Sequence, residues 1–246
     1  MKDNQFTIIE QREIAKEIFS LTLLGDIGEY EPGQFVQVEV SDTLEPFLRR
    51  PISICDIDNG KMRLVYRKKG RGTFLLSQKQ VGDRLKVLGP LGHGFPQKGP
   101  KATLIGGGIG VPPLLGLAKS MYLKGIKIKT LLGFNNKESA ILLDEFAVVS
   151  DLSIATIDGS LGHKGLVTDL IDDRDSLFYA CGPEALFKSL EREKLEGYYS
   201  LEKRMACGVG VCLGCNITVN NGDKDVRKRV CYDGPVFPIG SVRWEK

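Results

Sequence analysis

Four cysteines in the last fifth of this sequence have a spacing that suits a metal–sulfur cluster. Cys207, Cys212 and Cys215 are separated by four and two residues, and Cys231 follows after fifteen more. A C-x4-C-x2-C…C pattern is typical of plant-type [2Fe–2S] sites, where one loop wraps round the cluster and a later segment supplies the fourth thiolate. A structural zinc site normally has two C-x2-C pairs, so the first gap of four favours iron–sulfur over zinc. We expect positive φ angles in the loop that turn N–H groups toward the sulfurs, at Gly208, Gly210 and Gly214.

A second group of residues could bind a diphosphate and a flat ring. In Arg50-Pro51-Ile52-Ser53, the arginine can fork onto phosphate oxygens and the serine can offer a hydroxyl to a ring nitrogen. Alone, this segment also reads as a polar strand start. Six basic residues and no acidic one lie between residues 61 and 71, which include Val65-Tyr66-Arg67. Such a run is also typical of a solvated face, but Gly72-Thr73 behind it reads as a phosphate-binding nest at a helix start.

Two glycine-containing turns could bind a dinucleotide. Residues 106–113 place four glycines between an apolar segment and a helix-like one. In Gly108-x-Gly110-x-x-Pro113 a proline replaces the third Rossmann glycine, and no P-loop lysine follows. Whether or not a nucleotide binds, this segment is expected to form a tight turn between a strand and a helix. The number of glycines favours nucleotide binding. Cys181-Gly182-Pro183 ends another apolar segment, where open α/β sheets bind ligands, so Cys181 is either an inert buried thiol or a neighbour of a nicotinamide.

The elements that must position these residues fall into three groups. Short alternating segments at 6–9, 18–23, 35–40, 62–66 and 85–88, separated by glycines, predict an antiparallel barrel or sandwich. Strand-like segments at 102–105, 126–133, 153–157 and 177–181 alternate with helix-like ones at 112–123, 140–148, 166–171 and 183–197, which predicts a doubly wound parallel sheet. Beyond residue 201 the sequence has few apolar residues that could form a core, and its one expected element is a possible hairpin at 217–222. Such a segment needs further stabilisation, which a metal cluster can supply. We predict domains at 1–98, 99–200 and 201–246.

Composition excludes several classes of protein. The 34 basic and 31 acidic residues give a net charge of +3, too mild for a nucleic-acid-binding groove. The uncharged run 102–118 contains five glycines and two prolines and is short for a membrane span. The amino terminus lacks the apolar core of a secretory signal. We therefore expect a cytoplasmic protein with no nucleic-acid or membrane partner, whose clustered cysteines bind metal instead of forming disulfides.

The motifs Arg50-Pro51-x-Ser53, Gly108-x-Gly110-x-x-Pro113 and Cys181-Gly182-Pro183, in this order, resemble those of the ferredoxin–NADP reductase superfamily. That fold is a flavin-binding antiparallel barrel followed by a pyridine-nucleotide domain. Residues 205–215 and 231–237 are similar to the carboxyl-terminal part of electron-transfer subunits of NAD-dependent (class B) dihydroorotate dehydrogenase. The resemblance covers the whole chain, and its most specific part is the cysteine segment.

The resemblance implies three cofactor sites. FAD would bind in the barrel at Arg50, Pro51, Ile52, Ser53, Val65, Tyr66, Arg67, Gly72 and Thr73. NAD would bind at Gly108, Gly110, Pro113, Cys181, Gly182 and Pro183. A [2Fe–2S] cluster would bind at Cys207, Cys212, Cys215 and Cys231.

The resemblance also implies a partner. An FMN-containing catalytic subunit would oxidise dihydroorotate to orotate in pyrimidine (UMP) biosynthesis, in a heterotetramer with two copies of each subunit. Electrons would pass from that FMN through the cluster and FAD to NAD⁺, so no residue of this chain need abstract a substrate proton. His93 and His163 accordingly lie outside the motifs.

Two alternatives remain open at this point. The same cofactors could serve an NADPH:ferredoxin, hydrogenase, or sulfide or sulfite system. A zinc-bound interaction module without flavin chemistry is the alternative of a different class. For the nucleotide we expect NAD, because residues 133–138 contain no arginine that could bind a 2′-phosphate.

Overall fold

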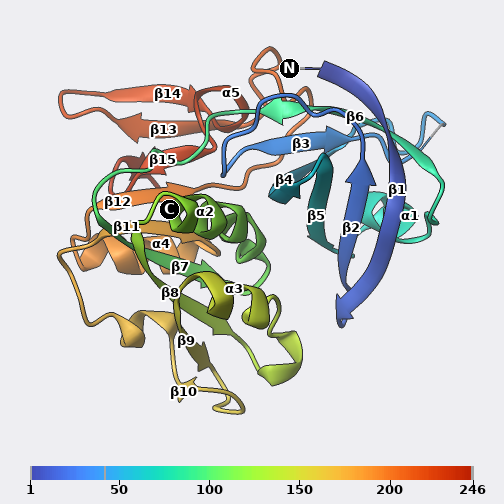
Figure 1. The fold of residues 1–246 in the computed structure, drawn as a ribbon. Helices are drawn as coiled ribbons and strands as arrows, with labels where there is room; N and C mark the ends of the chain where they lie inside the picture. The colour runs from blue at the N-terminus through green and yellow to red at the C-terminus, as the bar shows by residue number, and fades with distance from the viewer. Residues whose placement is uncertain (1, 42, 245–246) are drawn as a thin grey trace.

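In a computed structural model that describes residues 2–41 and 43–244, a barrel and a parallel sheet pack side by side, with a small sheet beside both (Figure 1). The predicted combination of antiparallel barrel, parallel-sheet domain and small carboxyl-terminal domain is confirmed. Within the described residues, no helix is long and apolar enough to cross a membrane.

Six antiparallel strands close the barrel in the order β1-β2-β5-β4-β3-β6. Apolar side chains alternate along β6, where Leu85 and Val87 enter the barrel core, whereas β3 and much of β4 are buried on both faces. A short helix, α1 (Arg71–Ser77), follows the fifth strand. The strands are β1 (Lys2–Ala15), β2 (Ile18–Leu24), β3 (Phe35–Val38), β4 (Arg50–Asp58), β5 (Lys61–Arg67) and β6 (Arg84–Leu91).

The second sheet has the order β10-β9-β8-β7-β11-β12-β15 and is parallel except for its last strand. Its parallel strands are β7 (Lys101–Gly107), β8 (Lys127–Phe134), β9 (Asp151–Thr156), β10 (His163–Lys164), β11 (Leu177–Cys181) and β12 (Gly197–Ser200). The helices are α2 (Pro112–Leu123), α3 (Leu143–Val149) and α4 (Glu184–Arg192), with 3-10 turns at Gly108–Gly110, Lys137–Ser139 and Val167–Leu170.

Two predicted helices are shorter in the structure. The helix expected at 166–171 is a single 3-10 turn, Val167–Leu170. The helix expected at 183–197 ends at Arg192, because the chain reverses through Lys194, which has φ +54°, and enters β12 at Gly197.

Helix α2 joins the barrel to the sheet. It is buried along most of its length and shares a core with Cys55 and Val65 of the barrel. A Cβ atom on Gly116 would lie 2.7 Å from the carbonyl oxygen of Cys55 and 2.8 Å from the hydroxyl of Tyr30. Only a glycine at this position lets the helix approach β4 so closely.

The carboxyl-terminal segment contains the predicted hairpin, formed by β13 (Asn216–Asn220) and β14 (Asp225–Arg229). It continues through α5 (Val230–Asp233), β15 (Val236–Pro238) and β16 (Val242–Arg243). The core of this segment is shared and not separate, because Val230 and Phe237 pack in one cluster with Phe187 and Tyr199. Strand β15 also pairs with β12, so this segment supplies the edge of the parallel sheet.

Candidate functional site

The four clustered cysteines come together as two pairs. The Sγ atoms of Cys215 and Cys231 are 3.2 Å apart, and the Cys231 N–H also points at the Cys215 sulfur, 3.4 Å away. The Cys212 N–H donates to the sulfur of Cys207, again at 3.4 Å. Residues 205–215 form an irregular loop, and Cys231 in α5 supplies the fourth thiol. The remaining cysteines, Cys55 and Cys181, are buried elsewhere, in β4 and β11.

Two thiol pairs suit a two-iron cluster better than a single ion. In a [2Fe–2S] cluster each iron takes two protein ligands. A zinc site needs three or four ligands that converge on one point. Within residues 2–41 and 43–244, no group of three Cys, His, Asp or Glu side chains has such an arrangement.

Backbone N–H groups make the cysteine loop a favourable place for thiolates. Partial burial raises the pKa of the Cys207 thiol, but hydrogen bonds from the N–H groups of Cys212 and Val209 outweigh it and lower the pKa to about 6. Burial and the neighbouring Cys215 thiol raise the pKa of Cys231 to about 12. The deprotonated form that binds metal is therefore favoured at Cys207 before any metal arrives.

The loop turns through three residues with positive φ, two of which were predicted. Gly208 has φ +70° and Gly210 has φ +83°, as expected. The third is Leu213, with φ +60°, and not the expected Gly214, whose N–H nevertheless donates to the Cys212 sulfur at 3.5 Å. A leucine in this conformation cannot be foreseen from the sequence, because local propensity disfavours it.

A cavity of about 370 Å³, here called the barrel cavity, lies between the barrel and the carboxyl-terminal segment. The carboxyl-terminal residues that border it were not identified from the sequence, and include Leu201, Lys203, Met205 and Pro235. Met205 lies two residues before the first clustered cysteine, so the cavity adjoins the cysteine loop. The residues expected to contact FAD that line the cavity are Pro51, Ile52, Ser53, Val65, Tyr66, Arg67 and Thr73.

Tyr66 brings an unsatisfied polar atom to the barrel cavity. Its ring stacks on Phe19 with centroids 5.7 Å apart, and its buried hydroxyl has no hydrogen-bond partner among the residues that the structure describes. Burial raises the pKa of this hydroxyl, so it remains protonated and can donate. An orphan hydroxyl on a residue that lines a cavity fits a ligand with acceptors, and a flavin ring offers both a stacking face and acceptors.

Arg50 and Gly72, the other two residues expected at the FAD site, lie against each other. A Cβ atom on Gly72 would collide with the guanidinium of Arg50, which also donates to the carbonyl of Leu48. The Thr73 hydroxyl accepts from the N–H groups of Lys69 and Gly70, at 2.9 and 3.2 Å, and closes the turn before α1. The arginine is thus held over a basic turn, as a diphosphate site requires.

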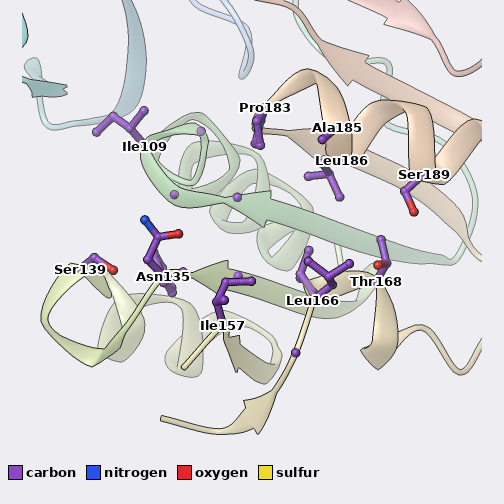
Figure 2. Close-up of a pocket in the computed structure, with 18 of the residues that line it drawn as sticks. Ile109, Asn135, Ser139, Ile157, Leu166, Thr168, Pro183, Ala185, Leu186 and Ser189 are labelled. Atoms are coloured by element: carbon purple, nitrogen blue, oxygen red, sulfur yellow. The ribbon is translucent and has the colours of Figure 1, made fainter. Parts of the chain in front are cut away.

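A second cavity of about 520 Å³, the sheet-edge cavity, opens at the carboxyl ends of the parallel strands (Figure 2). Of the residues expected to contact NAD, Gly108, Gly110, Gly182 and Pro183 line it. A Cβ atom on Gly110 would lie 2.5 Å from the backbone nitrogen of Gly182, so the two turns touch through glycine backbone. Such exposed backbone lets a pyrophosphate approach closely.

The other two residues expected at the NAD site lie elsewhere. Pro113 borders the barrel cavity. Cys181 is only 3% exposed, and burial raises its pKa, so its thiol is neutral and packed behind the cavity wall.

Figure 2 shows a wall of the sheet-edge cavity that sequence reasoning missed. Asn135, Ile157 and Thr168 face Pro183 and Ser189 across the carboxyl edge of the sheet. Asn135, Ile157 and Thr168 follow β8, β9 and β10 in turn. They lie close together only because these three strands are neighbours in the sheet. Arg67 is the one basic residue among the described residues that line this cavity, and the loop after β8 contributes Asn135 and Ser139 instead of a phosphate-binding arginine.

The two cavities meet, because Arg67, Ile109 and Glu202 line both. Glu202 was also missed from the sequence. Desolvation at this junction raises its pKa above the ordinary glutamate value, although the charge of Lys69 opposes the shift. A nucleotide in the sheet-edge cavity can therefore reach a ring in the barrel cavity without crossing a packed core.

The carboxyl-terminal segment matches a known family model. Residues 202–243 fit the model described as the iron-sulfur cluster binding domain of dihydroorotate dehydrogenase B. This match includes all four clustered cysteines.

The full chain is similar to curated proteins and to a solved structure. It is 48% identical over 255 residues to the electron transfer subunit of dihydroorotate dehydrogenase B (NAD(+)) from Geobacillus sp. (strain WCH70), covering 98% of this chain and 99% of that protein. The protein of the same description from Geobacillus thermodenitrificans (strain NG80-2) is 47% identical, with 97% of each chain covered. A solved NADH-dependent reduced ferredoxin–NADP oxidoreductase, studied for flavin-based electron bifurcation, superposes with a TM-score of 0.87 at 30% identity over 99% of this chain and 91% of that one.

Proposed function

The chain belongs to the family of electron transfer subunits of NAD-dependent dihydroorotate dehydrogenase B, and from this premise we propose which residues hold its cofactors and which partner it serves. Its function is to link the oxidation of dihydroorotate to NAD⁺, with FAD and a [2Fe–2S] cluster as cofactors. The observation that carries the assignment is the similarity to these subunits over nearly the full chain, at 48% identity. The four clustered thiols beside two connected cavities agree with it. When bound, the cluster supplies one-electron transfer and the flavin supplies hydride transfer to NAD⁺.

The cluster ligands that we propose are Cys207 and Cys212 as one pair, with Cys215 and Cys231 as the other. The donor chemistry fits, because four thiols lie together and N–H groups of the loop point at the Cys207 sulfur. The exposed Cys212 lies on the solvent side of the loop and the buried Cys215 and Cys231 lie on the protein side. A cluster held by these thiols would have one side near solvent, where a partner could approach, and one side toward the protein core.

FAD binding is proposed at the nine residues named from the sequence. Pro51, Ile52, Ser53, Val65 and Tyr66 would hold the ring system in the barrel cavity, where the orphan hydroxyl of Tyr66 donates to it. Arg50, in contact with Gly72, would bind the diphosphate together with the basic turn at Arg67 and Thr73. These residues bind and orient the flavin and keep water from one of its faces.

NAD binding is proposed in the sheet-edge cavity. The backbone turns at Gly108, Gly110, Gly182 and Pro183 would hold the pyrophosphate. The shared wall of Arg67, Ile109 and Glu202 would guide the nicotinamide into the barrel cavity, where Pro113 supports it from α2. Cys181 would support this edge from behind as a neutral buried thiol.

The partner that we propose is an FMN-containing dihydroorotate dehydrogenase catalytic subunit, in a heterotetramer with two copies of each chain. Clustered free thiols support a reducing, cytoplasmic location. The relatives at 48% and 47% identity favour this system over the ferredoxin-linked enzyme, which matches at 30%.

Copurification tests the proposed function. The full chain, expressed with a candidate catalytic subunit, should yield a brown-yellow complex that contains FMN, FAD and iron and reduces NAD⁺ with dihydroorotate. A colourless chain with one zinc and no flavin would contradict the proposal. Turnover with NADPH and ferredoxin, but not with dihydroorotate, would assign the chain to the alternative system.

A further inference from the structure

Gln37 in β3 holds a buried amide group that has no hydrogen-bond partner. The side chain is 0% exposed, and neither Nε2 nor Oε1 has a partner within the described part of the chain. Leaving such a group unsatisfied is unfavourable, because its lost contacts with water are not replaced. A buried orphan amide in a well-packed protein therefore calls for a ligand or another explanation.

The position of Gln37 places its amide between the barrel and the cysteine loop. Its neighbours Val36 and Val38 point into the barrel core, so Gln37 points out of the barrel on the opposite face of β3. Phe35, two residues earlier on that outer face, packs in one core with Cys215 and Cys231. Across the strand pair, Gln37 lies opposite Pro51, which lines the barrel cavity.

The side chain of Gln37 packs directly against Gly208, the residue after Cys207. A Cβ atom on Gly208 would lie 2.6 Å from Nε2 and 2.7 Å from Cγ of Gln37, so only glycine fits here. The loop around Gly208 already aims two N–H groups at the Cys207 sulfur, each 3.4 Å away. An additional donor, buried and unpaired, thus faces the same loop from the barrel side.

We propose that Gln37 donates a side-chain N–H to a sulfur of the cluster and raises the reduction potential of that cluster. This inference rests on the cluster assignment in the proposed function. Cluster sulfurs accept N–H hydrogen bonds, and they accept more strongly when the cluster is reduced and carries an extra negative charge. Each such donor therefore stabilises the reduced form. The barrel that binds the flavin would in this way also set the potential of the centre that exchanges electrons with it.

Gln37→Met tests the proposal in the full chain loaded with FAD and cluster. Methionine keeps the length and nearly the volume of glutamine but removes both polar atoms. In a redox titration followed by electron paramagnetic resonance, we expect the midpoint to become more negative. The reduced-to-oxidised ratio at a fixed potential should fall about two- to tenfold, the equivalent of one net hydrogen bond. Iron and FAD content should not change.

Gln11→Met provides the matched control. Gln11 lies in β1 and donates to the carbonyls of Leu76 and Lys79, at 3.2 and 2.9 Å. Its loss should lower stability but leave the cluster potential unchanged. An unchanged midpoint in Gln37→Met with full iron content, or an equal shift in both variants, overturns the proposal.

If Gln37→Met does not fold or loses iron, a measurement on the wild-type chain tests whether Gln37 donates to the cluster. With glutamine labelled at its side-chain nitrogen, pulsed paramagnetic resonance of the reduced cluster should detect a weak coupling to that nitrogen. Its absence overturns the role of Gln37 while leaving the proposed function intact. Absence of any [2Fe–2S] signal in the wild-type chain would instead contradict the proposed function.

Discussion

Tyr66 and Tyr30 each bury a hydroxyl with no hydrogen-bond partner among the described residues, but only Tyr66 borders the barrel cavity. Only the Tyr66 hydroxyl therefore belongs to a residue that a ligand in this cavity would contact. Burial raises the pKa of both hydroxyls, so both are donors at neutral pH.

Tyr66→Phe should weaken FAD binding. We expect the dissociation constant to rise about three- to tenfold, because one net hydrogen bond to the flavin is lost. Flavin fluorescence titration of the FAD-depleted chain measures this. Tyr30→Phe, the control, should leave FAD affinity unchanged and should not lower stability, because it removes an orphan group. Equal FAD affinity in wild type and Tyr66→Phe would contradict this role.

Cys231→Ser and Cys55→Ser should differ in iron content although both cysteines are buried. Serine at 231 removes a ligand, so the cluster and the paramagnetic signal of the dithionite-reduced chain should be lost or much reduced. Serine at 55 should keep the iron and lower stability by about 1–3 kcal/mol, because a hydroxyl replaces an enclosed thiol. Equal loss of iron from both variants would show that the ligand assignment is wrong.

At the scale of elements, the position of Arg50 in β4 depends on its contact with Gly72 in α1. Gly72→Ala places a methyl group against the guanidinium of Arg50. Because the end of an arginine side chain can move, we expect little loss of stability, but the arginine should leave its position over the turn.

The expected result of Gly72→Ala is an increase in the FAD dissociation constant of about tenfold, equivalent to one charge-assisted hydrogen bond. Gly70→Ala is the matched control. A Cβ atom there meets nothing within 4 Å, and its φ is an extended −155°. FAD affinity that is lowered equally by both substitutions would point to the turn itself and not to Arg50.

The elements that the sequence predicted well have a simple burial pattern. Strands of the barrel such as β6 alternate cleanly, and the four clustered cysteines reveal their loop by spacing alone. Strand β4 was recognised only at its polar start, because both of its faces are buried: Ile54 lies in the barrel core, and Cys55 lies under α2. Its sequence therefore lacks the alternation that identifies a half-exposed strand.

The missed parts of the site depend on strand order. Asn135, Ile157 and Thr168 carry no motif and meet only because β8, β9 and β10 are neighbours. Strand β12 was missed because it has four residues and begins with Gly197, which adopts φ +153°. Glu202 follows this unpredicted strand, so its place at the junction of the cavities could not be foreseen.

On the scale of the whole molecule, a group of charged side chains links the barrel to the helices that pack on the parallel sheet. Arg63 in β5 binds Asp56 of β4 at 2.8 Å and Glu145 of α3 at 2.6 Å, and Lys119 of α2 also pairs with Asp56. Burial raises the pKa of Asp56, but hydrogen bonds from Arg63 and Lys119 outweigh this effect and lower it below the ordinary 3.8. The ionised Asp56 therefore contributes its full stabilisation when the pH is above its unfolded-state pKa. This stabilisation is lost as the pH falls through the lowered folded-state pKa.

Asp56→Asn should lower the free energy of unfolding by about 3 kcal/mol near neutral pH, because it leaves the partly buried Arg63 and Lys119 with one anionic partner fewer. The difference in stability from wild type should narrow as pH falls below the ordinary aspartate value of 3.8 and through the lowered folded-state pKa, where the wild-type carboxylate becomes protonated. Denaturant unfolding across this pH range measures both effects. Asp144→Asn, on the exposed side of α3, should change little at any pH. A gap for Asp56→Asn that does not depend on pH would contradict the electrostatic explanation.

The pairing of β15 with β12 has a consequence for how the molecule is made. Cys231 precedes Val236–Pro238, so a ribosome releases all four thiols of the cluster before it releases the strand that completes the edge of the parallel sheet. Until β15 emerges, the edge of β12 that pairs with it is open. The nascent chain therefore offers the proposed cluster ligands before β15 joins the carboxyl-terminal segment to the parallel sheet.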